Sequence, residues 1–176
     1  MVEAEAHATP DLPFPVAVGG PYLLTDQTGQ PRSEADPAGH LQLLFFGYAS
    51  CQEICSAVLP QMADVAQALR GRGVSVTPVM ITVDPARDTV AAIGPALAKF
   101  GPDFIGLTGD PGGLAQAYSA FSIESAEVVQ MPDGSPVYAH GSYLYLLDGE
   151  GRVLTLFPPI LPLDRVIDLI AGYAAR

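Results

Sequence analysis

The sequence has few basic residues: eight Lys and Arg stand against 19 Asp and Glu in 176 residues, which gives a formal net charge of −11. A protein with this charge repels phosphate backbones, so general nucleic-acid binding is excluded. The same electrostatic field attracts cations and basic protein surfaces. The charge therefore fits two interpretations, simple solubility or a cationic ligand or partner.

Long hydrophobic runs are also missing. No apolar stretch reaches the roughly 18–20 residues that cross a bilayer, and residues 1–15 lack the basic and apolar regions of a signal peptide. This start contains three prolines and no periodic pattern. We predict a flexible N-terminal segment over residues 1–15 and a single soluble domain over residues 16–176. Whether a targeting or anchoring segment precedes the domain stays open.

Cysteine is scarce too, because Cys51 and Cys55 are the only two in the chain. They follow an apolar run, residues 41–48, at the point where a helical pattern begins. A strand that leads into a helix leaves side chains beside free N–H groups and the positive end of the helix dipole. Thiols at such a position ionise more easily, and the thiolate is the form that attacks disulfides or binds metal.

Three kinds of chemistry fit a Cys-x-x-x-Cys pair, whose sulfurs lie one helical turn apart. A structural disulfide is one, although a domain of this size does not need a small loop stapled at its edge. Thiol–disulfide exchange is another, although its usual motif has two intervening residues. The third is metal binding. Two thiolates make a soft site that suits Cu(I), whereas structural zinc normally takes four protein ligands.

Histidine is equally rare, which shortens the search for a further ligand to three residues. His7 lies in the unpatterned start. His40 precedes the strand that leads to Cys51, so about ten residues of extended chain put it at the opposite end of the sheet. His140 stands in a loop just before an apolar strand, and such a loop can lie beside the end of the strand that leads to the cysteines.

The apolar periodicity predicts alternating strands and helices with no internal repeat. Residues 22–29 form the first half of an N-terminal β-hairpin, and residues 142–157 form a second hairpin near the end. The predicted strands cover residues 22–29, 41–46, 74–83, 104–107, 128–131, 142–147 and 152–157, and the predicted helices cover 56–70, 88–100, 111–121 and 163–176. Asp110 should cap the third helix, and Asp88 or Thr89 the second. The pattern describes an α/β protein with one thioredoxin-like domain, a mixed central sheet flanked by helices.

Five motifs in this order resemble those of the Sco/SenC family, from about residue 16 to residue 173. They are residues 19–26 (GGPYLLTD), 46–51 (FGYASC), 83–89 (VDPARDT), 107–109 (LTG) and 140–148 (HGSYLYLLD). The family usually has Cys-Pro-x-x-Cys-Pro, and this chain has Gln52 and Ser56 in place of the two prolines. Proline limits the conformations of an empty loop, so the substitution bears on copper affinity and reduction potential.

The resemblance implies a thioredoxin-like fold with one copper ion, Cu(I) or Cu(II), held by Cys51, Cys55 and His140. It also implies a copper metallochaperone, rather than an enzyme, that matures the dinuclear copper site of cytochrome c oxidase subunit II. Family members generally face the periplasm or the mitochondrial intermembrane space, tethered by an N-terminal helix. We therefore expect a periplasmic, monomeric protein whose native form is tethered by a segment absent here.

Two other functions use the same residues. In a thiol–disulfide oxidoreductase that reduces a copper-receiving partner, Cys51 and Cys55 are the catalytic pair, with Cys51 as the attacking thiol. In a copper or redox sensor, the same ligands signal through a partner. A general thioredoxin-type reductase is disfavoured, because such enzymes have a cis-proline before the strand that faces the dithiol and this chain has Ala139 and His140 there.

Overall fold

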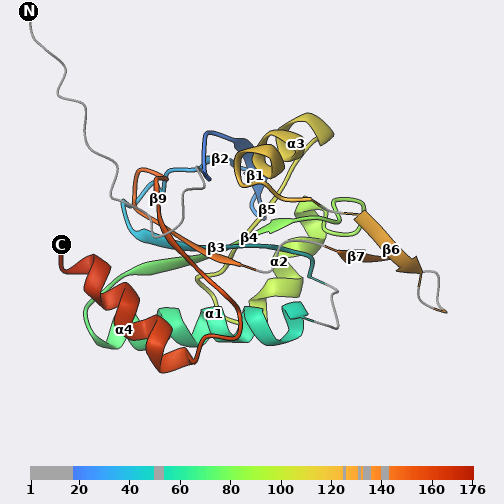
Figure 1. Cartoon of the computed structure of the whole chain (residues 1–176). Helices are drawn as coiled ribbons and strands as arrows, with labels where there is room; N and C mark the ends of the chain where they lie inside the picture. The colour runs from blue at the N-terminus through green and yellow to red at the C-terminus, as the bar shows by residue number, and fades with distance from the viewer. Residues whose placement is uncertain (1–17, 50–53, 125, 131, 133–135, 140–142) are drawn as a thin grey trace, which may run out of the picture.

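A computed structural model gives the fold, and it describes residues 18–49, 54–124, 126–130, 132, 136–139 and 143–176. Within this part the chain forms a seven-stranded sheet, a separate two-stranded sheet and four helices (Figure 1). The strands are β1 (Leu23–Asp26), β2 (Pro31–Ser33), β3 (Leu41–Gly47), β4 (Val76–Thr82), β5 (Ile105–Thr108), β6 (Ala126–Gln130), β7 (Pro136–Ala139), β8 (Leu144–Leu147) and β9 (Val153–Phe157). The helices are α1 (Ile54–Gly71), α2 (Val90–Ala98), α3 (Pro111–Ala120) and α4 (Leu163–Ala174). The predicted single α/β domain with a mixed sheet is confirmed.

The order of strands in the large sheet is β2-β1-β5-β4-β3-β8-β9. β3 runs parallel to β4 over seven residue pairs, from Leu41 opposite Val76 to Gly47 opposite Thr82, and β4 runs parallel to β5. β8 lies antiparallel to β3 on its other side. The predicted hairpins are present as the antiparallel pairs β1–β2 and β8–β9.

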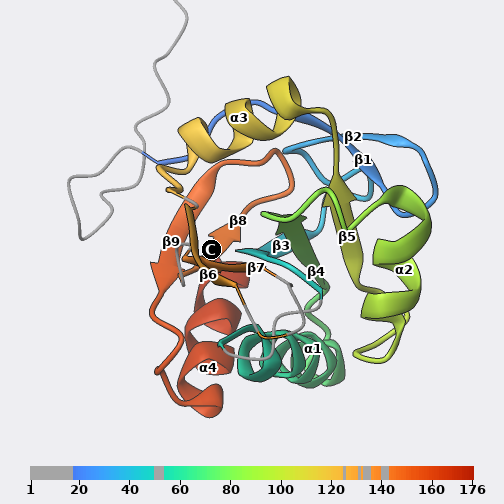
Figure 2. The ribbon, with the colours of Figure 1, turned by 90° about the vertical axis from the view of Figure 1, so that its right-hand side faces the viewer.

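Both faces of the sheet are covered, which explains why β3 is almost continuously apolar. Leu43 and Phe45 pack in the core shared with α1, α2 and α4. Leu44 and Phe46 point to the opposite face and pack in the core beneath α3. Figure 2 shows α1 and α4 on one side of the sheet and α3 on the other.

Two helices contain a proline inside their bounds. Pro60 lies within α1 and Pro95 within α2, and both helices continue past it. α1 begins at Ile54, two residues before the predicted start. Asp110 caps α3 as predicted: its carboxylate accepts hydrogen bonds from the N–H groups of Gly112 and Gly113, which lower the pKa of this side chain.

The two-stranded sheet of β6 and β7 is the part of the fold that the sequence predicted least well. A strand over residues 128–131 was expected, and β6 ends at Gln130, whereas β7 was not predicted. β6 and β7 pair antiparallel and extend away from the large sheet (Figure 1). β7 starts at Pro136 and has only four residues, too few to show an alternating pattern.

An aromatic cluster fills the core beneath α3. The Phe121 ring lies 5.3 Å from that of Phe46 and 5.1 Å from that of Tyr145, measured between ring centroids. Phe121 is 1% exposed and Phe46 is fully buried. The Phe121 and Tyr145 rings meet edge to face and the Phe46 ring is tilted against Phe121. Aromatic pairs at these distances stabilise a core beyond the apolar area that they bury.

Replacing Phe121 by alanine should therefore lower the free energy of unfolding by about 3–5 kcal/mol, the usual cost of removing a buried aromatic ring. Tyr145→Phe is the control, because it keeps the ring and removes only a hydroxyl that lies 3.4 Å from the Phe121 carbonyl oxygen. Its cost should stay below about 1.5 kcal/mol. Urea denaturation measures both values, and equal losses in the two variants would contradict the packing described here.

Candidate metal centre

The chain around the two cysteines enters from β3 and leaves into α1. β3 ends at Gly47, whose carbonyl oxygen accepts a hydrogen bond of 2.7 Å from the N–H of Val83. Val83 follows the last residue of β4, so backbone hydrogen bonding between the two chain segments continues one residue beyond β4. α1 begins at Ile54, which puts the backbone of Cys55 in its first turn. Cys51, the side chain of Cys55 and His140 all lie outside the described residues. Their predicted role as ligands stays a prediction.

The strand order nevertheless brings two distant segments to one edge of the sheet. β8 runs antiparallel to β3, with Tyr145 opposite Leu44 and Leu147 opposite Gln42. The start of β8 therefore lies beside the end of β3. His140 precedes Leu144, the first residue of β8, by four positions in the sequence. The chain that contains His140 thus leads into the same edge at which β3 ends and the Cys51 loop begins.

The beginning of α1 favours an anion. The first turn contains no acidic residue, and Ser56 and Ala57 are exposed whereas Val58 and Leu59 are buried. The N–H groups of a first turn and the positive end of the helix dipole stabilise negative charge nearby. These features would stabilise a thiolate close to this turn, and exposed Ser56 and Ala57 leave the turn accessible to solvent or a partner protein.

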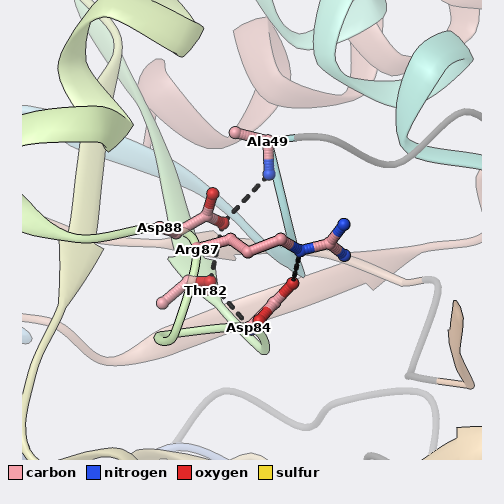
Figure 3. Close-up of polar contacts among 5 residues, drawn as sticks. All are labelled: Ala49, Thr82, Asp84, Arg87 and Asp88. Atoms are coloured by element: carbon pink, nitrogen blue, oxygen red, sulfur yellow. Dashed lines mark hydrogen bonds and ion pairs between the residues drawn. The ribbon is translucent and has the colours of Figure 1, made fainter. Parts of the chain in front are cut away.

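A buried polar network joins the residues before Cys51 to the end of β4 (Figure 3). The Oδ2 atom of Asp88 accepts hydrogen bonds from the Ala49 N–H at 3.0 Å and from the Thr82 hydroxyl at 2.7 Å. The Thr82 Oγ1 in turn accepts the N–H of Asp84 at 2.9 Å. Burial raises the pKa of Asp88, against the hydrogen bonds from Thr82 and Ala49, which lower it.

An ion pair lies beside this network. The guanidinium Nε of Arg87 donates to Oδ2 of Asp84, whose side chain is 1% exposed. The other oxygen of Asp84 is buried and has no hydrogen-bond partner among the described residues. Arg87 also lies over the ring of Tyr48, with 5.6 Å between the guanidinium carbon and the ring centroid. Together these contacts hold residues 84–88 against the chain that leads to Cys51.

The sequence identified this segment but not its contacts. Thr89 occupies the N-cap position of α2, yet its side chain makes no capping hydrogen bond, and the Asp88 carboxylate turns to Thr82 and Ala49 instead. The expected side-chain cap is therefore wrong. The sequence did contain a signal for this network. Asp84, Arg87 and Asp88 closely follow a strand predicted to be buried, and buried carboxylates need hydrogen-bond or ionic partners.

No competing metal site appears in the part of the chain that the structure describes, where no group of three His, Cys, Asp or Glu side chains could hold an ion. His40 is exposed and directly precedes β3, at the end of that strand away from the cysteines. A pocket of about 250 Å³ lies between the later turns of α1 and residues 100–104, the segment before β5. It therefore opens near the opposite edge of the sheet.

The family profile of SCO1/SenC matches residues 10–175. The chain belongs to the SCO1/SenC family. Among curated relatives, an SCO2-like protein of Rickettsia conorii is 36% identical over 144 residues, which cover 81% of this chain and 70% of that protein. The resemblance seen in the five sequence motifs is confirmed.

Solved Sco structures confirm the thioredoxin-like fold. Arabidopsis thaliana ScoI with copper bound has a TM-score of 0.83 at 28% identity, over 89% of this chain and 97% of that one. Bradyrhizobium japonicum ScoI with copper bound has a TM-score of 0.78 at 30% identity, and the match covers 89% of this chain and 99% of that one. A third structure, BsSco, shares the fold with a TM-score of 0.67 at 22% identity, and the match covers 89% of this chain and 94% of that one. BsSco is a member of the Sco family of cytochrome c oxidase assembly proteins, and it has a disulfide switch.

None of the helices in the described ranges is both long and apolar enough to cross a bilayer.

The ion pair beside the Sco cysteine loop yields a stability prediction. Arg87→Ala leaves the Asp84 carboxylate buried without its cation, so the free energy of unfolding should fall by about 1–3 kcal/mol. Arg72→Ala is the matched control, because Arg72 pairs with Asp168 where both side chains are at least half exposed. Such a pair contributes less than about 1 kcal/mol. Equal losses in urea denaturation would contradict a structural role for the Arg87–Asp84 pair.

Proposed function

We propose that this chain is a copper metallochaperone of cytochrome c oxidase assembly, with one copper ion held by Cys51, Cys55 and His140. The donor set fits the ion, because two thiolates suit Cu(I) and an added imidazole suits Cu(II). Copper is cargo here rather than a permanent cofactor. Membership of the SCO1/SenC family and the copper-bound Sco structures support the assignment.

One observation about this chain carries the proposal. β3 and β8 are adjacent antiparallel strands, with Leu44 opposite Tyr145. The strand that leads to Cys51 therefore ends beside the start of the strand that follows His140. The described segments that lead to these two residues thus lie side by side at one edge of the sheet. A dithiol and an imidazole need such a meeting point to share one ion.

Copper transfer would proceed by ligand exchange. An incoming thiolate or imidazole of the recipient bonds to the ion as one of the three donors leaves, so the oxidation state of copper does not change. A site of two or three ligands near exposed Ser56 and Ala57 permits this exchange, whereas a closed four-ligand cage would resist it.

The recipient that we propose is the dinuclear copper site of cytochrome c oxidase subunit II. The net charge of −11 would attract a recipient with a basic docking surface. Such a recipient faces the bacterial periplasm, so we assign the same location to this chain and propose that its native form is tethered to the inner membrane. It would act as a monomer.

Copper titration of the reduced protein tests the ligand set. The wild type should bind one equivalent and show a thiolate-to-Cu(II) charge-transfer band. Cys51→Ser and Cys55→Ser should abolish the band, and His140→Ala should weaken Cu(II) binding by more than roughly 100-fold, since loss of even an outer partner of a ligand costs 10–100-fold. Some Cu(I) should stay on the two thiols of His140→Ala.

His40→Ala is the matched control for that experiment, because His40 is exposed at the other end of β3. It should bind copper like the wild type. An unchanged Cu(II) spectrum in His140→Ala would show that the ligand assignment is wrong.

A second experiment separates the chaperone from an oxidoreductase. Copper-loaded protein is mixed with the purified copper-free domain of subunit II, and transfer is followed by the absorption of the recipient. The chaperone should deliver copper without oxidation of its own thiols. Reduction of a recipient disulfide in the absence of copper, with Cys51 and Cys55 becoming a disulfide, would instead establish thiol–disulfide exchange as the activity.

A further inference from the structure

The backbone two residues before Cys51 is held by a side chain from a different loop. The Ala49 N–H donates to Asp88, which stands 39 positions later in the connection between β4 and α2. Asp88 is 4% exposed, and Ala49 is buried as well. A hydrogen bond to a carboxylate is stronger than one between neutral groups, and burial protects it from competing water.

Asp88 is itself held in place by the end of β4. Its Oδ2 atom also accepts the hydroxyl hydrogen of Thr82, which is fully buried. The Thr82 carbonyl oxygen accepts a hydrogen bond of 2.6 Å from the Tyr118 hydroxyl of α3. Figure 3 shows the Asp88 carboxylate between Ala49 and Thr82. The anchor is therefore tied to the central sheet.

The covalent structure of the cysteine loop offers no substitute for this anchor. No proline occurs from Gly47 to Leu59, so none of these residues has its φ angle fixed by a ring. A loop without proline has more conformations to lose when it orders. The hydrogen bond at Ala49 supplies a restraint at the start of the loop, where the parallel ladder of β3 has just ended.

We infer that Asp88, oriented by Thr82, is a positioning residue for the Cys51–Cys55 dithiol. It fixes the backbone of Ala49 and thereby raises the effective concentration of each thiol near the other. Asp88 touches neither sulfur nor copper in this account. The inference deepens the proposed function, because it assumes that the two cysteines act as a pair.

The redox equilibrium with glutathione measures that effective concentration without copper. In the reaction, the protein dithiol and oxidised glutathione give the protein disulfide and two molecules of reduced glutathione, so two electrons and two protons pass to glutathione. Asp88→Ala should lower the equilibrium constant for forming the protein disulfide by about tenfold, which raises the reduction potential by about 30 mV. Thr82→Val should shift it in the same direction.

A second buried carboxylate provides the matched controls. Asp36 is 7% exposed and accepts the Thr77 hydroxyl at 2.8 Å and the Ala38 N–H at 2.7 Å, which are the same kinds of donor that Asp88 has. Thr77 lies near the start of β4, and Thr82 is its last residue. Asp36→Ala and Thr77→Val should lower the free energy of unfolding but leave the glutathione equilibrium unchanged.

Asp88→Asn distinguishes positioning from charge. Asparagine retains an oxygen that can accept from Ala49 and Thr82, so this variant should recover most of the wild-type equilibrium. A shift as large as that of Asp88→Ala would make the negative charge the cause and overturn the inference. Equal shifts in the Asp36 and Asp88 variants, or no shift in Asp88→Ala, would also overturn it.

Two features keep the test decisive. If Asp88→Ala does not fold, the comparison of Thr82→Val with Thr77→Val decides, because each removes the hydroxyl that donates to one buried carboxylate. Thr82→Val also removes the acceptor of the Asp84 N–H, so it should lower the free energy of unfolding more than Thr77→Val does. The copper titration of the wild type tests the proposed function separately. A wild type that binds no copper but differs from Thr82→Val in the glutathione equilibrium would refute the chaperone and uphold the anchor.

Discussion

The parallel pairing of β3 with β4 is the constraint on which the rest of the structure depends. Its seven residue pairs run to the last residue of both strands, Gly47 and Thr82, so two loops leave the sheet at the same edge. One loop carries Cys51 and the other carries Asp88. Because parallel strands end together, the residues that follow them come close to each other, and the Ala49 N–H donates a hydrogen bond to Asp88.

The same edge of the sheet contains buried charged groups, whose desolvation opposes folding. Asp84 and Asp88 are almost fully buried, and buried carboxylates are costly unless they find partners. Arg87 and Thr82 supply those partners, and Arg87 adds a contact with the Tyr48 ring. Burying a purely apolar loop would cost less desolvation free energy. The polar contacts instead specify one position for the backbone that leads to the cysteines.

The apolar layers on either side give this arrangement a rigid support. Side chains of β3 alternate between the core beneath α3 and the core shared with α1, α2 and α4. The Tyr118 hydroxyl connects the first of these layers to the carbonyl oxygen of Thr82. The proposed copper transfer by ligand exchange would need an accessible ion held by pre-positioned donors. The hydrogen bond that fixes the Ala49 backbone and the exposed start of α1 are consistent with both needs.

The sequence by itself determined the class of fold, most of the strands and helices, the family and the three candidate ligands, because apolar periodicity and the motifs around Cys51, Cys55 and His140 are local signals. It missed β7, which is too short for a periodic pattern, and it assigned Asp88 or Thr89 to a helix cap. Only the tertiary structure decided that Asp88 bonds to Ala49, since their 39-residue separation leaves no local trace. Only the strand order decided that β8 lies beside β3, because which strands pair depends on packing of the whole sheet.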